Sequence, residues 1–124
     1  MIDFGNKSLV KLKQENTENG YQIIALHLGN SEQVIASFVS MRDRVIFTNK
    51  RIISVNVQGI TGTKIDYTSI PYNKIQLYSV ETAGTMDLDS ELDIWISGMG
   101  KIRFEFSGST DVVAISRLIS EFVL

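Results

Sequence analysis

The chain has 124 residues, of which 44% are apolar and 21% charged, which is ordinary usage for a globular protein and argues against a disordered or fibrous one. The 12 basic and 14 acidic residues give a net charge of −2, so a strong general affinity for nucleic acid or anionic membranes is not expected. The absence of cysteine excludes disulfides, thiolate metal sites and cysteine nucleophiles.

The length predicts a single domain over residues 1–124. The first residues lack the basic head and apolar core of a secretory signal, and no apolar run approaches the roughly 20 residues of a membrane span. We therefore expect a soluble, cytoplasmic protein.

The first twenty residues are polar and are expected to form a variable N-terminal segment. Leu9, Val10 and Leu12 are its apolar cluster, so the pattern predicts a short helix near Ser8 to Glu15. The next segment, Tyr21 to Leu28, is apolar enough to be either a strand or a buried helical turn.

Residues 32–41 are predicted to form a strand that ends in a tight reversal at Arg42-Asp43. This strand carries apolar side chains on both faces and few guarding charges, which is typical of a sheet edge that pairs with another copy. We therefore expect it to be the edge strand used for self-association. The residues expected at this edge are Val34, Ile35, Ala36, Phe38, Val39 and Met41.

The stretch Arg44 to Val57 predicts a β-hairpin, because two β-branched and aromatic runs flank a polar break. The runs are Val45–Phe47 and Ile52–Val57, and the reversal is expected at Thr48–Lys50. Asn49 is the candidate for a positive φ there, since asparagine tolerates that backbone conformation best after glycine.

Further strands are predicted at Lys64–Ile70 and Lys74–Ala83, on either side of the only proline, Pro71, which cannot donate to a sheet ladder. The two glycines of Gln58–Thr63 are interpreted as a plain turn, because no helix follows them as a phosphate-binding loop would require.

Strict alternation of apolar and polar residues predicts the last two strands, Glu91–Ser97 and Ile102–Phe106. The period then changes. Apolar residues recur at three- and four-residue spacing from Val112 to Phe122, which predicts a helix of about 13 residues with one apolar stripe, capped by Ser109 or Thr110. We expect this helix to cover the open end of a β-sandwich or barrel.

Seven candidate strands followed by one amphipathic helix resemble the layout of the pleckstrin-homology (PH)-like superfold. Several segments from Leu28 to Leu124 also resemble, in order, the stand-alone bacterial PH domain family, whereas the residues before Tyr21 depart from that pattern. The matching segments are Val45–Asn49, Thr48–Ile53, Gln58–Gly62, Ser69–Tyr72, Ser79–Gly84, Asp87–Leu92 and Ile94–Gly98.

The resemblance implies a mainly β fold with a C-terminal α-helix, namely a PH-like, partly open antiparallel barrel or sandwich of seven strands capped by one helix. It implies no catalytic activity and no cofactor. It also implies homo-oligomeric rings, with a pentamer as the expected form, joined through sheet edges. It carries over no ligand and no site residues.

The basic residues around the early strands suggest a second hypothesis, an anionic lipid headgroup or small-molecule site. They are Arg42, Arg44, Lys50, Arg51 and Lys64. Because Asp43 and Asp66 lie among them, a solvated surface is the favoured interpretation, with Arg51 expected to pair with an acidic neighbour.

Other candidate sites also have a simpler structural interpretation. The alternating carboxylates could be imagined to hold a divalent cation, but the run lacks the internal glycine of a calcium loop, so we expect no metal. They are Asp87, Asp89, Glu91 and Asp93. His27, the only histidine, is expected to be a packing residue, and so are Trp95, Tyr67, Tyr72 and Tyr78.

No nucleophile, base and orienting group stand out together, so the sequence does not predict an enzyme. The leading hypothesis is a module that binds proteins, beginning with copies of itself.

Overall fold

The structure is a computed structural model that describes residues 8–41, 43–58, 62–86 and 88–124. Eight strands form one sheet in the order β5-β4-β3-β2-β1-β8-β7-β6. The strands are β1 (Ser8–Glu15), β2 (Val34–Val39), β3 (Asp43–Thr48), β4 (Arg51–Gln58), β5 (Lys64–Pro71), β6 (Ile75–Glu81), β7 (Ser90–Ile96) and β8 (Gly100–Phe106). The helices are α1 (Thr17–Ile24) and α2 (Val112–Val123), with 3-10 turns η1 (Ala25–His27) and η2 (Tyr72–Lys74).

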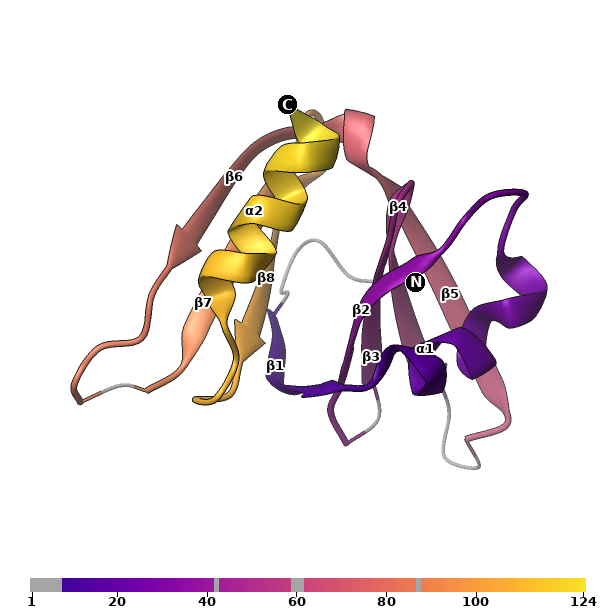
Figure 1. The fold of residues 1–124 in the computed structure, drawn as a ribbon, viewed down its shortest axis with the longest axis horizontal. Helices are drawn as coiled ribbons and strands as arrows, with labels where there is room; N and C mark the ends of the chain where they lie inside the picture. The colour runs from indigo at the N-terminus through magenta and orange to yellow at the C-terminus, as the bar shows by residue number, and fades with distance from the viewer. Residues whose placement is uncertain (1–7, 42, 59–61, 87) are drawn as a thin grey trace.

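The sheet bends into two halves, and α2 lies in front of the half formed by β6, β7 and β8 (Figure 1). This arrangement confirms the predicted mainly β fold with a C-terminal helix. The described residues contain one strand more than predicted, because the N-terminal segment is itself a strand.

β1 joins the two halves. Its last residues pair antiparallel with β2, and its first residues pair parallel with β8. The register shifts between Leu9 and Leu12, where Lys11 has a φ of 57°. The prediction of a helix here is wrong. Leu9 and Leu12 have helical spacing, but the irregularity at Lys11 lets both side chains reach the core from one strand.

The main core lies between the two halves of the sheet and is closed by α2. Four phenylalanines, Phe38, Phe47, Phe104 and Phe106, are almost wholly buried there. α2 adds Val112, Ile115 and Ile119 to this core, and the ring of Phe122 stacks on Tyr72 with 5.1 Å between ring centres. The predicted closing helix is therefore confirmed.

The N-terminus of α2 is capped by Asp111, whose Oδ1 accepts a hydrogen bond of 3.1 Å from the Ala114 amide. The expected cap at Ser109 or Thr110 is wrong by one or two residues. Both caps satisfy the same need, since the first amides of a helix lack partners within it.

α1 covers the outer face of the other half. Ile24 packs there with Ile46, Ile53 and Val55 in a second apolar cluster. The segment that could have been a strand or a helical turn is therefore helical. α1 approaches β2 so closely that a Cβ on Gly20 would lie 2.5 Å from Ser37 Oγ.

Candidate functional site

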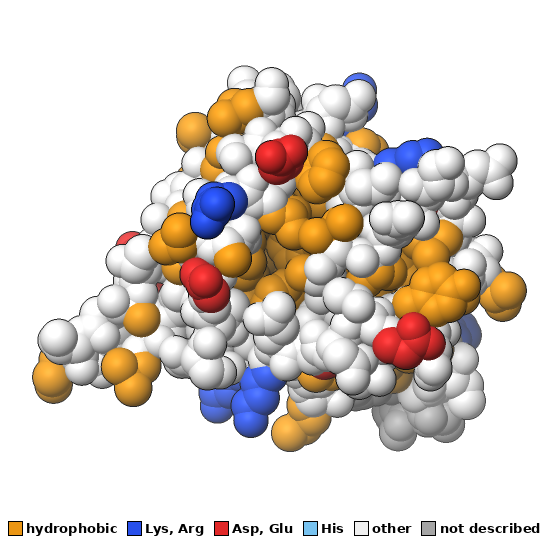
Figure 2. All heavy atoms as spheres, viewed as in Figure 1, with side chains coloured by type: hydrophobic (Ala, Val, Ile, Leu, Met, Phe, Trp, Pro, Cys, Tyr) orange, Lys and Arg blue, Asp and Glu red, His pale blue; other side chains and the backbone are white. Residues whose placement is uncertain are grey.

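The described surface is hollowed between α2 and β2. α2 packs against β6, β7 and η2, and it leaves a groove of about 490 Å³ on its other side. Figure 2 shows hydrophobic side chains gathered in this hollow. The groove is lined chiefly by Ile35, Ala36, Phe38, Ile115, Leu118 and Phe122.

Polar groups occur at the margin of the groove. Gln14, Asp111 and Glu121 line it with exposed side chains. No lysine or arginine is found among the described residues that form its lining. The groove therefore combines an apolar floor with acidic ends.

The strand order contradicts the expectation that residues 32–41 form an edge of the sheet. β2 lies between β3 and β1, because the N-terminal segment supplies the extra strand. Phe38 is 1% exposed, and Ala36 is also buried. Two other residues of the expected edge are exposed, namely Ile35 at 41% and Met41 at 98%.

The edges of the described sheet are β5 and β6, each of which pairs on one side only. β5 is guarded by Lys64 and Asp66 and ends at Pro71. β6 has a single charged residue, Glu81 at its end, and its Leu77 is 56% exposed. Unpaired backbone groups and exposed apolar side chains make β6 the less protected edge.

The predicted basic residues do not form one patch. In the register of β4 and β5, Lys64 lies opposite Gln58 at one end of β4, and Arg51 lies opposite Pro71 at the other. The eight residues of β4 separate these ends by roughly 23 Å of extended chain. Arg42 lies outside the described residues.

Two other basic residues of the predicted patch, Arg44 and Lys50, already have partners within the chain. Arg44 Nε lies 2.9 Å from Glu15 Oε2 in a partly buried ion pair. Lys50 Nζ donates to the Asn30 carbonyl oxygen at 2.9 Å. A headgroup would have to displace these contacts, which weakens the case for an anion site.

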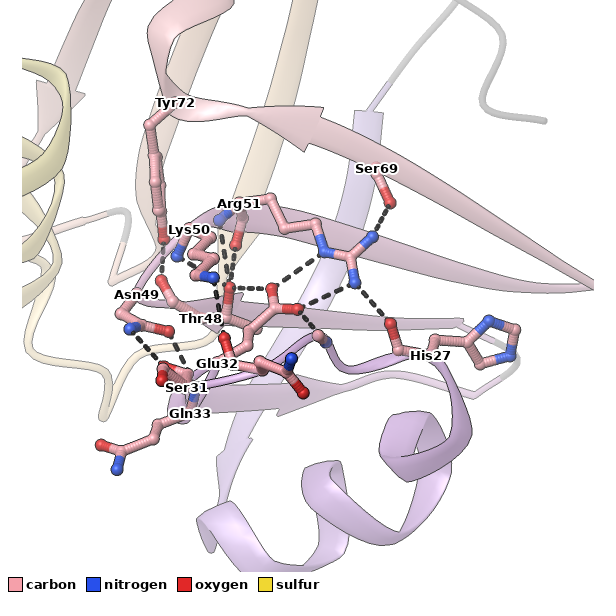
Figure 3. Close-up of polar contacts among 12 residues, drawn as sticks. His27, Ser31, Glu32, Gln33, Thr48, Asn49, Lys50, Arg51, Ser69 and Tyr72 are labelled. Atoms are coloured by element: carbon pink, nitrogen blue, oxygen red, sulfur yellow. Dashed lines mark hydrogen bonds and ion pairs between the residues drawn. The ribbon is translucent and has the colours of Figure 1, made fainter.

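Arg51 is held in an internal network, as the sequence led us to expect (Figure 3). Its Nε and Nη2 each lie 2.9 Å from one carboxylate oxygen of Glu32. Nη1 donates to Ser69 Oγ at 2.8 Å, and Nη2 also donates to the His27 carbonyl oxygen at 2.7 Å. Arg51 therefore joins β4 to β5 and to the segment that follows α1.

The Glu32 carboxylate is buried, with 2% of its side chain exposed. Burial alone would raise its pKa. Hydrogen bonds from Arg51, the Gly29 amide and the Thr48 hydroxyl outweigh this and lower the pKa of Glu32 to about 2. The buried charge is thus kept ionised by donors from three segments.

The β3–β4 hairpin and its reversal at Asn49-Lys50 confirm the sequence prediction. Asn49 is not among the described residues with positive φ, so that expectation is wrong. Its side chain instead accepts from the Gln33 amide at 2.8 Å and donates to the Ser31 carbonyl oxygen at 3.0 Å. Asn49 ties the hairpin to the start of β2 (Figure 3).

The run of alternating carboxylates is divided. Asp87 lies outside the described residues. On β7, Glu91 and Asp93 both pair with Arg103, at 3.1 and 2.9 Å. No group of three side chains suited to a metal ion occurs in the part of the chain that is described.

His27 and the aromatic residues engage in packing contacts. The His27 ring lies 4.1 Å from that of Tyr67. Tyr72 donates a buried hydrogen bond of 2.7 Å to the Thr48 carbonyl oxygen. Lys101 Nζ lies 5.9 Å from the ring centre of Trp95. These contacts give each residue a structural role.

Comparison with known proteins identifies the family. A family model described as the bacterial PH domain matches residues 3–123. The chain belongs to the bacterial PH domain family. The match begins before Tyr21, so the N-terminal segment that departs from the expected pattern is also part of the family's domain.

This bacterial PH domain is 60% identical to the uncharacterized protein YjqA of Bacillus subtilis (strain 168) over 91 residues, which are 72% of this chain and 73% of YjqA. The YjqA match adds no known activity.

Two solved structures are similar in both sequence and fold. A DUF1696 family protein with a pleckstrin-homology domain from Shewanella loihica PV-4 has a TM-score of 0.81 and 40% identity, covering 93% of this chain and 99% of that one. A pleckstrin homology domain from Shewanella amazonensis SB2B has a TM-score of 0.68 and 39% identity, covering 89% of this chain and 90% of that one.

A PH-domain-containing bacterial protein from Exiguobacterium sibiricum 255-15 shares the fold alone, with a TM-score of 0.72 and 19% identity. The match covers 91% of this chain and 62% of that protein. In the described part of this bacterial PH domain, neither helix is long and apolar enough to cross a membrane.

Proposed function

We propose that this bacterial PH domain is a non-catalytic module for protein association, and that it assembles with copies of itself through its sheet edges. The observation that supports this is the pair of different edges, β5 and β6, each with one side unpaired among the described strands. Pairing with another chain would satisfy their free N–H and C=O groups.

Contact between β6 of one copy and β5 of the next is head-to-tail, because the two surfaces differ. Such contacts close into a ring when the rotation between neighbours divides a full turn. We propose a pentamer as the closed form, as was expected from the sequence. The edge strands differ from the one expected at first, since β2 is paired on both sides over half its length.

The test is the mass of the protein in solution, by light scattering coupled to size exclusion. The wild type is expected to be an oligomer, and Leu77→Lys, which puts a charge on β6, should shift it toward the monomer. Val113→Lys is the matched control, since Val113 is 54% and Leu77 56% exposed and Val113 lies on α2. A wild type that is monomeric at high micromolar concentration would refute self-assembly.

The alternative is binding of an anionic headgroup or small molecule. It has less support, because Arg44 and Arg51 are ion-paired and lie near opposite ends of β4. Flotation with anionic liposomes at physiological salt separates the two functions, since an assembly module should remain in solution.

A further inference from the structure

β2 is only partly paired on the side of β1. The register joins Lys13 with Val39, Gln14 with Phe38 and Glu15 with Ser37, and there β1 ends. The chain then turns away into α1, with Asn16 as the N-cap. Among the described residues, 34–36 therefore have no strand partner on this side, although β3 pairs with Val34 and Ala36 on the other.

The unpaired half of β2 borders the groove opposite α2, since Ile35 and Ala36 are part of its lining. Figure 1 shows β2 across from α2, and Figure 2 shows hydrophobic side chains gathered in the hollow. The register with β3 shifts between Val34 and Ala36, so Ile35 is an extra residue in β2. Such an irregularity redirects side chains. Both Ile35 and Ala36 line the groove, whereas strict alternation would direct them to opposite faces.

A stretch of strand without a neighbouring strand and an apolar wall occur together here. An extended segment in the groove could form backbone hydrogen bonds with residues 34–36, as in other cases of strand addition. Alternate side chains of that segment would then meet Phe38, Leu118 and Phe122 on the floor and on α2. The groove fits an added strand better than a helix, because a helix would leave the free edge of β2 unsatisfied.

The charges at the margin indicate what the ends of such a segment should carry. Asp111 caps α2 and Glu121 lies near its C-terminus, so they are separated by about 15 Å of helix axis. That length corresponds to about five residues of extended chain. Both carboxylates line the groove, and the described lining has no cation to balance them.

We propose that this groove binds a short extended segment of a partner protein, added as a strand beside residues 34–36, with alternating apolar residues and a lysine or arginine at each end. The proposal rests on the proposed role in protein association and specifies the partner's chemistry. The site is distinct from the β5 and β6 edges, so the two can be tested separately.

The test is selection of random peptides displayed on phage against the immobilised full chain, with affinities measured by fluorescence anisotropy of the recovered peptides. We expect enrichment of peptides with alternating apolar residues between lysines or arginines. Ile35→Lys should weaken their binding about tenfold or more, because it places a like charge beside the peptide. Leu88→Lys is the matched control, since Leu88 is 62% exposed and lies between β6 and β7, outside both the groove lining and the sheet edges, and it should leave binding unchanged.

Glu121→Lys is the second variant, since it reverses a rim charge without removing the helix cap at Asp111. It should weaken basic peptides and leave binding of uncharged ones almost unchanged. Failure to enrich any peptide, or equal binding to the wild type and Ile35→Lys, would overturn the proposal. Peptide binding that occurs only in the Leu77→Lys variant would also overturn it, because the groove would then be covered by a second copy.

The result is independent of the self-assembly test. A monomeric wild type that binds these peptides would remove the proposed ring and leave the groove proposal standing. An oligomeric wild type that binds none of these peptides would overturn the groove proposal and leave the proposed self-assembly standing.

Discussion

Arg51 and Glu32 form a two-point ion pair in which two guanidinium nitrogens each lie 2.9 Å from a different carboxylate oxygen. Planar pairing of this kind is among the stronger charged contacts in proteins. It fastens the segment before β2 to β4. Because 2% of the Glu32 side chain is exposed, the carboxylate depends on Arg51 and on its other donors rather than on water.

Arg51→Met is expected to destabilise the fold by about 2 to 3 kcal/mol, because it leaves a buried carboxylate without its counterion. Urea denaturation followed by tryptophan fluorescence of Trp95 measures the loss. Lys64→Met, which removes an exposed cation from β5, should change stability by about 0.5 kcal/mol or less. Equal effects from the two substitutions would contradict the role given to the ion pair.

The same carboxylate makes stability depend on pH. The pKa of Glu32 is lowered from 4.5 to about 2 in the folded state. Its stabilising contribution is therefore fully present above the unfolded pKa and is lost as the pH falls from about 5 toward 2. Glu32→Gln should flatten this part of the curve of unfolding free energy against pH. A variant curve as steep as that of the wild type would count against the prediction.

The parts of the fold that follow one regular period were predictable from the sequence. β7, β8 and α2 alternate or recur cleanly, and the β3–β4 hairpin is marked by its polar break. β1 was not predictable in this way, because its irregularity at Lys11 gives two strand residues, Leu9 and Leu12, the spacing of a helix. Missing β1 made β2 look like an edge.

The groove could not be predicted, because it depends on the spacing between α2 and β2. These two elements are far apart in the sequence. One signal was present in the sequence. Val34, Ile35 and Ala36 are consecutive apolar residues, which breaks the alternation of a strand with one solvated face. The pairing of Arg51 with an acidic residue was expected from the sequence, but its partner, Glu32, lies 19 residues earlier and was not identified.

Gly20→Ala is expected to destabilise the protein by about 1 to 3 kcal/mol, because the added Cβ would lie 2.5 Å from Ser37 Oγ. Ser37 cannot move away freely, since its hydroxyl donates a 2.6 Å hydrogen bond to Glu15. This cost should outweigh the gain in helix propensity, which is at most about 1 kcal/mol.

Gly29→Ala is the control for Gly20→Ala. A Cβ on Gly29 would meet Glu32 Oε1 at an ordinary 3.8 Å. Thermal unfolding should show a clear drop in Tm for the first variant and almost none for the second. If Gly20→Ala raised the Tm, the close packing of α1 on β2 would be wrong.

Lys11→Gly tests the irregularity that lets β1 belong to both halves of the sheet. Lys11 has a φ of 57°, which costs a residue with a side chain roughly 1 kcal/mol relative to glycine. Glycine at this position should therefore raise the unfolding free energy by up to about 1 kcal/mol. The same substitution at Lys13, an exposed residue of β1 without a positive φ, should lower it by about 0.5 to 1 kcal/mol. Opposite signs at two lysines two residues apart would locate the left-handed position in β1, whereas a loss of stability at both would mean that β1 runs straight through Lys11.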